Sequence, residues 1–285
     1  MEPRTCSIED QLRASNFAMT AAIKLSSPAT KEFWEIPVLF EDEHLLALDK
    51  PAGLLTSPDA DHPELPSLIA LLHAGIAEAK AWARERSLSY LMNAHRLDSD
   101  TSGVILLAKT KPALLALADQ FGTNLPLRKY LAIIRGDPQA DQFEVDAKIG
   151  PHQVLPGIMR IDHETGKKSK TLFTVLEKFQ RGGDALLRCE PRTDRTHQIR
   201  VHLRHAGFTV IGDQLYGGKP LWLSRLKPDY RLKPGKEERP LLARAALHGE
   251  SLELTHPATN APLTITAELP KDMKVALKYL RQFAA

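Results

Sequence analysis

Residues 93–108 of the chain have the sequence NAHRLDSDTSGVILLA. Most positions before residue 104 are ionisable or small and polar, whereas 104–108 are apolar without interruption. A short apolar run bounded by polar residues predicts a buried strand, and a polar loop held by such a strand is a frequent place for a functional site. The following run, 111–121, has Pro112 in its first turn and the apolar spacing of an amphipathic helix. We therefore expect a loop, a buried strand and a helix in succession.

Strand patterns dominate the chain around this segment. Two short apolar runs within 38–48 flank an acidic turn and predict a hairpin, whereas residues 65–86 predict one helix. Further strands are expected at 130–135, 143–149, 170–179, 185–190 and 198–203. Many of their connections are too short for a helix, which favours antiparallel pairing. The sequence thus predicts an α+β fold, with a mixed, mainly antiparallel sheet and flanking helices.

The composition is typical of a folded globular protein, with 43% hydrophobic and 26% charged residues. A net charge of +3 permits a polyanionic partner without requiring one. Cys6 and Cys189 are too few for a disulfide framework or a cysteine zinc site, which favours a reducing compartment. No apolar run approaches the roughly 18 residues that a membrane span needs, and the N-terminus lacks a basic-then-apolar block. We expect a cytoplasmic protein.

The domain organisation follows from the same patterns. Residues 1–30 are polar and weakly patterned, so we expect a partly disordered N-terminal extension, with one compact domain over 31–285. Residues 219–240 are rich in Lys, Arg and Pro and predict an exposed basic loop.

Asp98 is the candidate reactive group in the polar loop. It can act as a nucleophile or base, with Arg96 nearby and the backbone amides of residues 101–103 free to orient it. An Asx turn explains the same aspartate without any chemistry. The loop alone leaves both interpretations open.

A second candidate segment, 192–205, has the sequence RTDRTHQIRVHLRH. Alternation predicts a strand that places Arg200 among apolar neighbours. An unpaired buried charge is very costly, so Arg200 needs a carboxylate or a phosphate, and Asp98 is a candidate partner. Phosphate contacts, or simple solvation at the surface, explain the other arginines of the segment, Arg192, Arg195 and Arg204.

Other site classes find less support. The histidines lack the spacing of a zinc site, and no acidic cluster accompanies them, so no metal is expected. Ser99 and Ser102 lack the motif of a hydrolase nucleophile. A glycosidase pair of Asp98 with Asp100 is disfavoured, because acids two residues apart in a loop are seldom suitably disposed.

Six sequence blocks occur in order between about residues 37 and 269, and together they resemble the RluA-type family of pseudouridine synthases. The blocks are LDKPAGLL (48–55), HRLDSDTSG (95–103), RKYLAIIRG (128–136), DRTHQIRVH (194–202), GDQLYG (212–217) and LHGESLELTHP (247–257). The resemblance implies the pseudouridine synthase fold with a central RNA-binding cleft. About 30 residues before the first block are too few for the S4-type domain that many relatives carry.

The resemblance also implies roles for individual residues. The catalytic aspartate falls on Asp98, the active-site tyrosine on Tyr130 and the carboxylate-pairing arginine on Arg200. Arg96 matches an arginine that occupies the space left by the displaced nucleotide. We expect the remaining substrate contacts from three residues of the two signature blocks, His95, Arg195 and His197. One departure is Asp194, which stands where the family usually has glycine.

The implied reaction converts uridine to pseudouridine in structured RNA, either 23S ribosomal RNA or transfer RNA. It cleaves the N1–C1′ bond, turns the uracil and rejoins it through C5, so it requires no cofactor. Asp98 attacks C1′ or removes the C2′ proton, and Tyr130 stacks on the uracil and can take the C5 proton. The target must leave its stack, and residues 219–240 become a candidate RNA clamp. We expect a monomer, and the alternative is a non-catalytic RNA-binding protein on the same fold.

Overall fold

Strand β6 (Ser102–Ala108) lies in the middle of the sheet and is buried along its whole length. The computed structural model describes residues 22–233 and 235–284. Side chains alternate across a strand, so Ile105 and Leu107 enter one hydrophobic core and Val104, Leu106 and Ala108 enter another. The predicted buried strand is confirmed, and its two-sided burial explains the unbroken apolar run.

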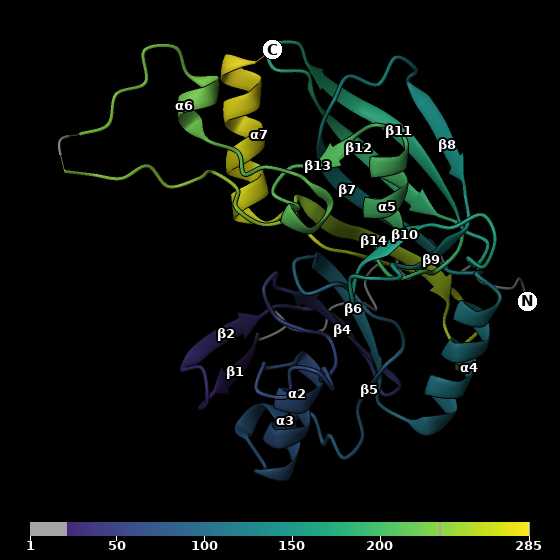
Figure 1. Ribbon diagram of the computed structural model, residues 1–285. Coiled ribbons are helices and arrows are strands. Elements are labelled where there is room, and N and C mark those ends of the chain that lie inside the picture. Colours follow the sequence, from purple (N-terminus) through teal and green to yellow (C-terminus); the bar gives the residue numbers. More distant parts are fainter. Residues whose placement is uncertain (1–21, 234, 285) are drawn as a thin grey trace, which may run out of the picture.

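The main sheet confirms the α+β expectation (Figure 1). Within the described residues its strands follow the order β3 (Val38–Glu41), β4 (Leu45–Lys50), β6, β14 (Leu247–Thr255), β7 (Leu127–Arg135), β12 (Asp184–Pro191), β11 (Lys170–Phe179) and β8 (Gln142–Asp146). Three short strands, β5 (Met92–Asn93), β13 (Thr209–Val210) and β15 (Pro262–Thr266), pair with β6, β7 and β14. Strands β6 and β14 run parallel, and the other neighbours are antiparallel.

Two hairpins lie beside this sheet. In the first, β1 (Ile23–Ser27) pairs with β2 (Glu32–Ile36), and Ile23 and Leu25 are buried in the same core as Leu107. The expected boundary at residue 31 is therefore wrong for this strand, because apolar residues at alternate positions already anchor it. Residues 1–21 of the expected extension lie outside the described residues. The second hairpin joins β9 (Ile149–Pro151) to β10 (Met159–Ile161).

The helices follow the sequence pattern with one interruption. Helix α4 (Lys111–Gly122) has Pro112 in its first turn, and the Thr110 side chain accepts the N–H of Ala113. The helix expected over 65–86 is two helices, α2 (Leu68–Ala77) and α3 (Ala81–Glu85), because Ala79 between them has a φ of 50°. Two helices were not expected: α6 (Leu223–Leu226), which lies inside the basic segment 219–240, and the amphipathic C-terminal α7 (Lys271–Phe283). In the described residues, no helix has the length and apolar character needed to cross a membrane.

Residues 198–203 form part of helix α5 (Gln198–His205), so the predicted strand is wrong. All six of these residues are buried. Ile199 and Leu203, one helical turn apart, pack into the large core, whereas Val201 packs into a smaller cluster with Ile149 and Tyr216. Apolar residues on both sides of a short helix produce the same alternation as a half-buried strand, so the period cannot distinguish the two. Helix α5 lies against β11 and β12 (Figure 1).

Candidate active site

Asp98 and Arg200 meet at the junction between the loop before β6 and helix α5. Nη1 of Arg200 donates to Oδ2 of Asp98 at 3.0 Å. The Arg200 side chain is 6% exposed and that of Asp98 is 21% exposed. The pairing predicted from the cost of a buried guanidinium is confirmed, although Arg200 reaches the site from a helix and not from a strand.

Asp213 is a second partner of Arg200 that the sequence did not reveal. Its two carboxylate oxygens accept from Nε and Nη2 of Arg200, both at 2.7 Å. Asp213 is the N-cap of the 3-10 helix η1 (Gln214–Tyr216) and is buried. Burial alone lowers the pKa of Arg200, but the carboxylates of Asp213 and Asp98 outweigh it and raise that pKa above its usual value. The guanidinium is therefore a fixed cation beside Asp98.

His197 connects Asp98 to Tyr216. Its Nδ1 lies 2.8 Å from the Tyr216 hydroxyl, which also accepts the backbone N–H of Met159 at 3.0 Å. The hydroxyl proton is then directed to Nδ1, which leaves the ring proton on Nε2, 3.9 Å from Oδ2 of Asp98. Burial lowers the pKa of His197, so the neutral ring is the dominant form at neutral pH.

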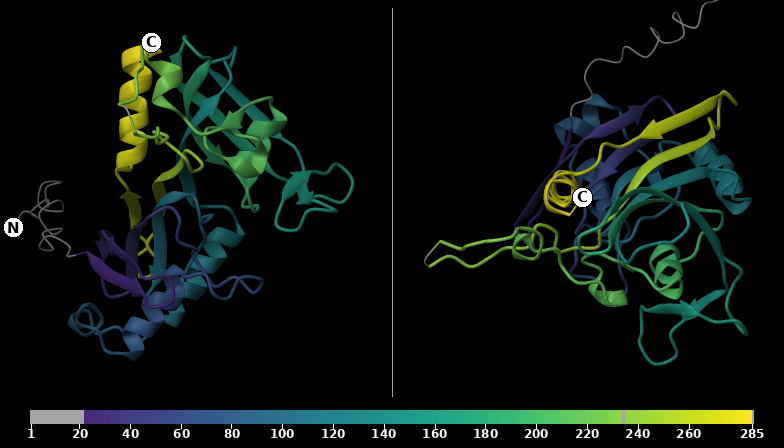
Figure 2. Two further views of the ribbon diagram at one scale, coloured as in Figure 1. Left: turned by 60° about the vertical axis from the view of Figure 1, so that its left-hand side comes forward. Right: turned by 90° about the horizontal axis from the view of Figure 1, so that it is seen from above.

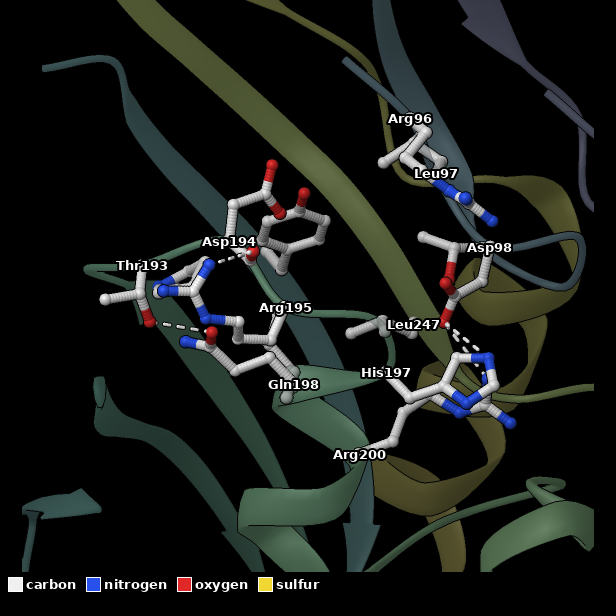
Figure 3. A pocket seen from close by; sticks show the side chains of 14 residues that line it. Arg96, Leu97, Asp98, Thr193, Asp194, Arg195, His197, Gln198, Arg200 and Leu247 are labelled. Atoms are coloured by element: carbon white, nitrogen blue, oxygen red, sulfur yellow. Dashed lines mark hydrogen bonds and ion pairs between the residues drawn. The ribbon is translucent and has the colours of Figure 1, made fainter. Parts of the chain in front are cut away.

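Tyr130 lines the same pocket as Asp98 and Arg200. We call this the site pocket. Figure 3 shows Arg96, Leu97 and Asp98 on the right, with His197 and Arg200 next to Asp98, whereas Thr193, Asp194, Arg195 and Gln198 lie to their left. Burial raises the pKa of Tyr130 to about 12, with Asp194 and Asp98 adding to the rise against the opposing charge of Arg128. The phenol is therefore protonated at neutral pH.

A deep cleft adjoins the site pocket and shares Asp98 with it. We call it the site cleft; its lining includes Arg96, Asp98, Gly157, His197, Arg200 and Asp213. The Asp98 carboxylate, the Arg200 cation and the Tyr130 ring thus line one pocket, which adjoins the cleft.

The family model described as RNA pseudouridylate synthase matches residues 44–205. The chain belongs to this family. It is similar to ribosomal large subunit pseudouridine synthase D of Nitrosomonas europaea, with 38% identity over 86% of this chain and 65% of that protein, slightly under two thirds of its length. The same-named protein of Pseudomonas aeruginosa is 36% identical over 87% of this chain and 72% of its own length. Ribosomal large subunit pseudouridine synthase C of Escherichia coli (strain K12) is 35% identical over 86% of this chain and 70% of its own length.

Solved structures agree with this assignment. Human RNA Pseudouridylate Synthase Domain Containing 4 aligns with a TM-score of 0.62 and 25% identity, covering 86% of this chain and 92% of that one. Human RNA Pseudouridylate Synthase Domain Containing 1 supports the fold. It aligns with a TM-score of 0.58 and 21% identity, covering 87% of this chain and 95% of that one. The synthase fold expected from the sequence blocks is confirmed.

Two of the remaining predicted contact residues line the site, but His95 does not. Arg96 is exposed in the site cleft, and Arg195 lines the site pocket while its Nε donates to the carbonyl of Lys168 at 3.1 Å. His95 is buried in the synthase core, where its Nε2 accepts the N–H of Leu106 at 3.1 Å and its ring stacks on Phe121. The expected substrate contact of His95 therefore needs correction, because the ring positions the start of the site loop from inside the core.

Asp194, which replaces the usual glycine, lines the site pocket and forms an ion pair with Arg128. Its Oδ2 lies 3.0 Å from Nη1 of Arg128, a buried residue of β7 whose Nη2 donates to the carbonyl of Thr193. Asp194 is not among the described non-glycine residues with positive φ. The backbone here therefore does not require glycine, and the substitution adds an anchored carboxylate at the edge of the pocket.

Lys50 and Thr56 support the site loop from beneath, and neither was predicted. The fully buried Lys50 ammonium donates to the carbonyls of Pro51, Leu54 and Ser99, the last at 3.1 Å. The Thr56 hydroxyl donates to the carbonyl of Leu97 and accepts its N–H. Thr56 therefore holds the backbone before Asp98, and Lys50 holds the backbone after it. The signal in the sequence was the LDKPAGLL block, which contains Lys50.

Proposed function

We propose that this synthase isomerises uridine to pseudouridine in large-subunit ribosomal RNA, with Asp98 as the reacting carboxylate. The observation that carries the proposal is the pairing of Asp98 with Arg200 in a pocket shared with Tyr130. Ribosomal RNA is favoured over transfer RNA because the similar bacterial proteins are named as ribosomal large subunit synthases. The reaction requires no cofactor, and we expect a cytoplasmic monomer.

Asp98 has the arrangement that both possible routes require. Its ion pair with Arg200 and its contact with the neutral His197 ring both use Oδ2, among the described residues. Oδ1 is then the oxygen that attacks C1′ or removes the C2′ proton of the ribose. Arg200, held by Asp213, keeps the carboxylate oriented while this oxygen reacts.

Tyr130 supplies the aromatic surface for the uracil. A phenol that is protonated at neutral pH is a weak base. If it removes the C5 proton after the uracil has rejoined the ribose, it must pass its own proton on in the same step. The Asp98 carboxylate lines the same pocket and is the acceptor that fits this transfer. N1 of the uracil, which no longer bonds C1′, takes up a proton in turn, so the isomerisation gains and loses no atoms.

The target uridine enters by leaving its base stack, and Arg96 occupies the space that it vacates. Unstacking costs a few kcal/mol and is easiest in loops and bulges. The exposed position of Arg96 at the site cleft suits a side chain that enters the RNA while Asp98 stays behind it.

The basic segment 219–240 forms an RNA clamp in this proposal. It leaves the fold just after Tyr216 and returns just before Ala243, which lines the site cleft. Figure 1 shows that the segment, which includes α6, extends away from the body on the side where α7 lies. Arg225, Lys227 and Arg231 are exposed along it. Reversing these three charges should weaken RNA binding and flatten its salt dependence, since each phosphate contact contributes roughly 0.7–0.9 to the slope. Unchanged affinity and slope would refute the clamp.

The deciding experiment compares wild type with Asp98→Asn. Each protein is incubated with an unmodified transcript of large-subunit ribosomal RNA and, in parallel, with transfer RNA transcripts. Carbodiimide labelling should detect a product of unchanged mass in the ribosomal transcript with wild type, and the variant should lose roughly a thousandfold or more in rate. Product in transfer RNA alone would change the substrate assignment. RNA binding without product would favour the non-catalytic alternative.

A further inference from the structure

The hairpin of β9 and β10 exposes two large apolar side chains. Its tip, residues 152–158, has the sequence HQVLPGI, in which Val154 is 79% exposed and Leu155 is 48% exposed. Figure 2 shows this hairpin projecting from the body of the molecule. Single exposed apolar residues are common on protein surfaces, but two adjacent ones on a projecting tip are a candidate contact surface.

The tip is held in one conformation by its own hydrogen bonds. Nδ1 of His152 accepts the backbone N–H groups of Val154 and Leu155, at 3.2 and 3.1 Å. The N–H of His152 donates to the carbonyl of Ile158 at 2.7 Å and closes the loop. The two apolar side chains are therefore presented on an ordered turn, so contact with a partner costs little conformational entropy.

The foot of the hairpin is attached to the active site. The N–H of Met159 donates to the hydroxyl of Tyr216, the same hydroxyl that bonds His197. Tyr216 also packs with Ile149 of β9 in a small hydrophobic cluster. Gly157, at the tip, lines the site cleft together with Asp98. The apolar tip thus has a fixed position at the mouth of the cleft.

We propose that Val154 and Leu155 form an apolar contact for an RNA base that neighbours the target uridine. This inference rests on the proposed function. A base beside a flipped nucleotide loses one stacking partner, and aliphatic side chains can cover the exposed ring face, as apolar wedges do at unstacked steps in other nucleic-acid complexes.

Charge and size both favour RNA as the occupant. Two exposed lysines lie near the foot of the hairpin. The backbone of Lys167 forms a β-bridge with Ile149 of β9, and the carbonyl of Lys168 accepts from Nε of Arg195. These cations suit the phosphates on either side of a bound base. Two side chains are also far too small for a stable protein interface, which buries about 800 Å² on each partner.

The test measures binding in the Asp98→Asn protein, so that turnover does not interfere. Val154 and Leu155 are both changed to Ser, and affinity is measured with the unmodified large-subunit ribosomal RNA transcript. Binding should weaken roughly tenfold or more, because loss of even one of the two aliphatic contacts costs on the order of 1.4 kcal/mol. The salt slope should stay the same, because an apolar contact releases no counterion. Leu115→Ser, on α4, is the matched control at a position with 68% exposure and should bind like the parent.

A second measurement reports the contact itself. A stem-loop is built around the uridine that wild type modifies, with 2-aminopurine on each side of it. The fluorescence change on binding should differ between the parent and the double variant at one of the two positions. Affinity within twofold of the parent, or an equal loss in Leu115→Ser, would overturn the contact, as would a change only in self-association. Absence of pseudouridine with wild type would instead refute the proposed function, because the transcript affinity is measured independently of turnover.

Discussion

Arg200 binds Asp213 through two hydrogen bonds of 2.7 Å and reaches Asp98 through a single one of 3.0 Å. Asp213 is 1% exposed, so it is the structural anchor of the guanidinium, whereas the more exposed Asp98 keeps an oxygen for chemistry. Breaking a buried pair by removing one partner costs about 3–5 kcal/mol.

We predict that Asp213→Asn lowers the free energy of unfolding by about 3 kcal/mol and reduces activity, because Arg200 loses its orientation. Asp98→Asn should abolish activity with a smaller stability loss, because Arg200 keeps both of its hydrogen bonds to Asp213. Urea denaturation of both variants, together with the pseudouridine assay, compares the two effects. A larger stability loss in Asp98→Asn than in Asp213→Asn would contradict this division of roles.

The buried His95 ring should make the protein sensitive to acid. Burial, reinforced by the nearby Arg128 cation, lowers the pKa of His95 from 6.5 to about 4. Between these two values the unfolded chain binds more protons than the folded one, so the free energy of unfolding falls as the pH falls from 6.5 towards 4. The contribution of this residue is about 3 kcal/mol over the whole window. His95→Gln keeps an acceptor for the N–H of Leu106 but does not titrate, so denaturation curves at several pH values should show a shallower decline for it. If the free energy of unfolding fell equally with pH in wild type and in His95→Gln, His95 would not be the source of the acid sensitivity.

The pairing of Asp98 with Arg200 was predictable from sequence because it follows from a general cost. A guanidinium among apolar neighbours needs an anion wherever the chain places it, and the loop before β6 offered a suitable carboxylate. Asp213 was not predictable in the same way. It lies in a short turn with no apolar pattern, and only the folded chain shows that this turn passes beneath α5.

The secondary structure was predictable where an unbroken apolar run or a solvated outer face reveals the element, as in β6 and α4, and not in the short buried segment 198–203. Pro112 and the apolar spacing of α4 specified where it begins, and its outer face is exposed. Residues 198–203 are buried on all sides, so the apolar alternation of Ile199, Val201 and Leu203 carried no information on period. The broken helix at Ala79 depends on a single left-handed residue, for which alanine gives no signal.

The carboxylate of Asp194 should weaken the binding of RNA. It is half-exposed at the rim of the site pocket and offsets the charge of Arg128. We predict that Asp194→Asn binds the ribosomal transcript roughly threefold more tightly at low salt, and that the gain shrinks as salt screens the interaction. Filter binding at several salt concentrations measures both effects. Thr196→Asn, an exposed neighbour with no charge to lose, is the control. Weaker binding by Asp194→Asn would show that Asp194 contacts the RNA favourably.

Gly103, the second residue of β6, allows a close backbone approach beside the site. It has a φ of 117°, and a Cβ built on it would lie 2.2 Å from the carbonyl oxygen of Gly249 in β14. These two residues are partners in the parallel pairing that links the site loop to the C-terminal half of the sheet. Backbone atoms cannot withdraw as a flexible side chain can, so Gly103→Ala should cost about 3 kcal/mol or more and should also displace the Asp98 loop.

Gly122→Ala is the matched control, because nothing lies within 4 Å of its Cβ position, and it should be neutral or slightly stabilising. The melting temperature and the rate of RNA turnover should therefore both fall for Gly103→Ala. Both should stay near the wild-type values for Gly122→Ala. Equal behaviour of the two variants would mean that β6 and β14 can separate without loss of the site.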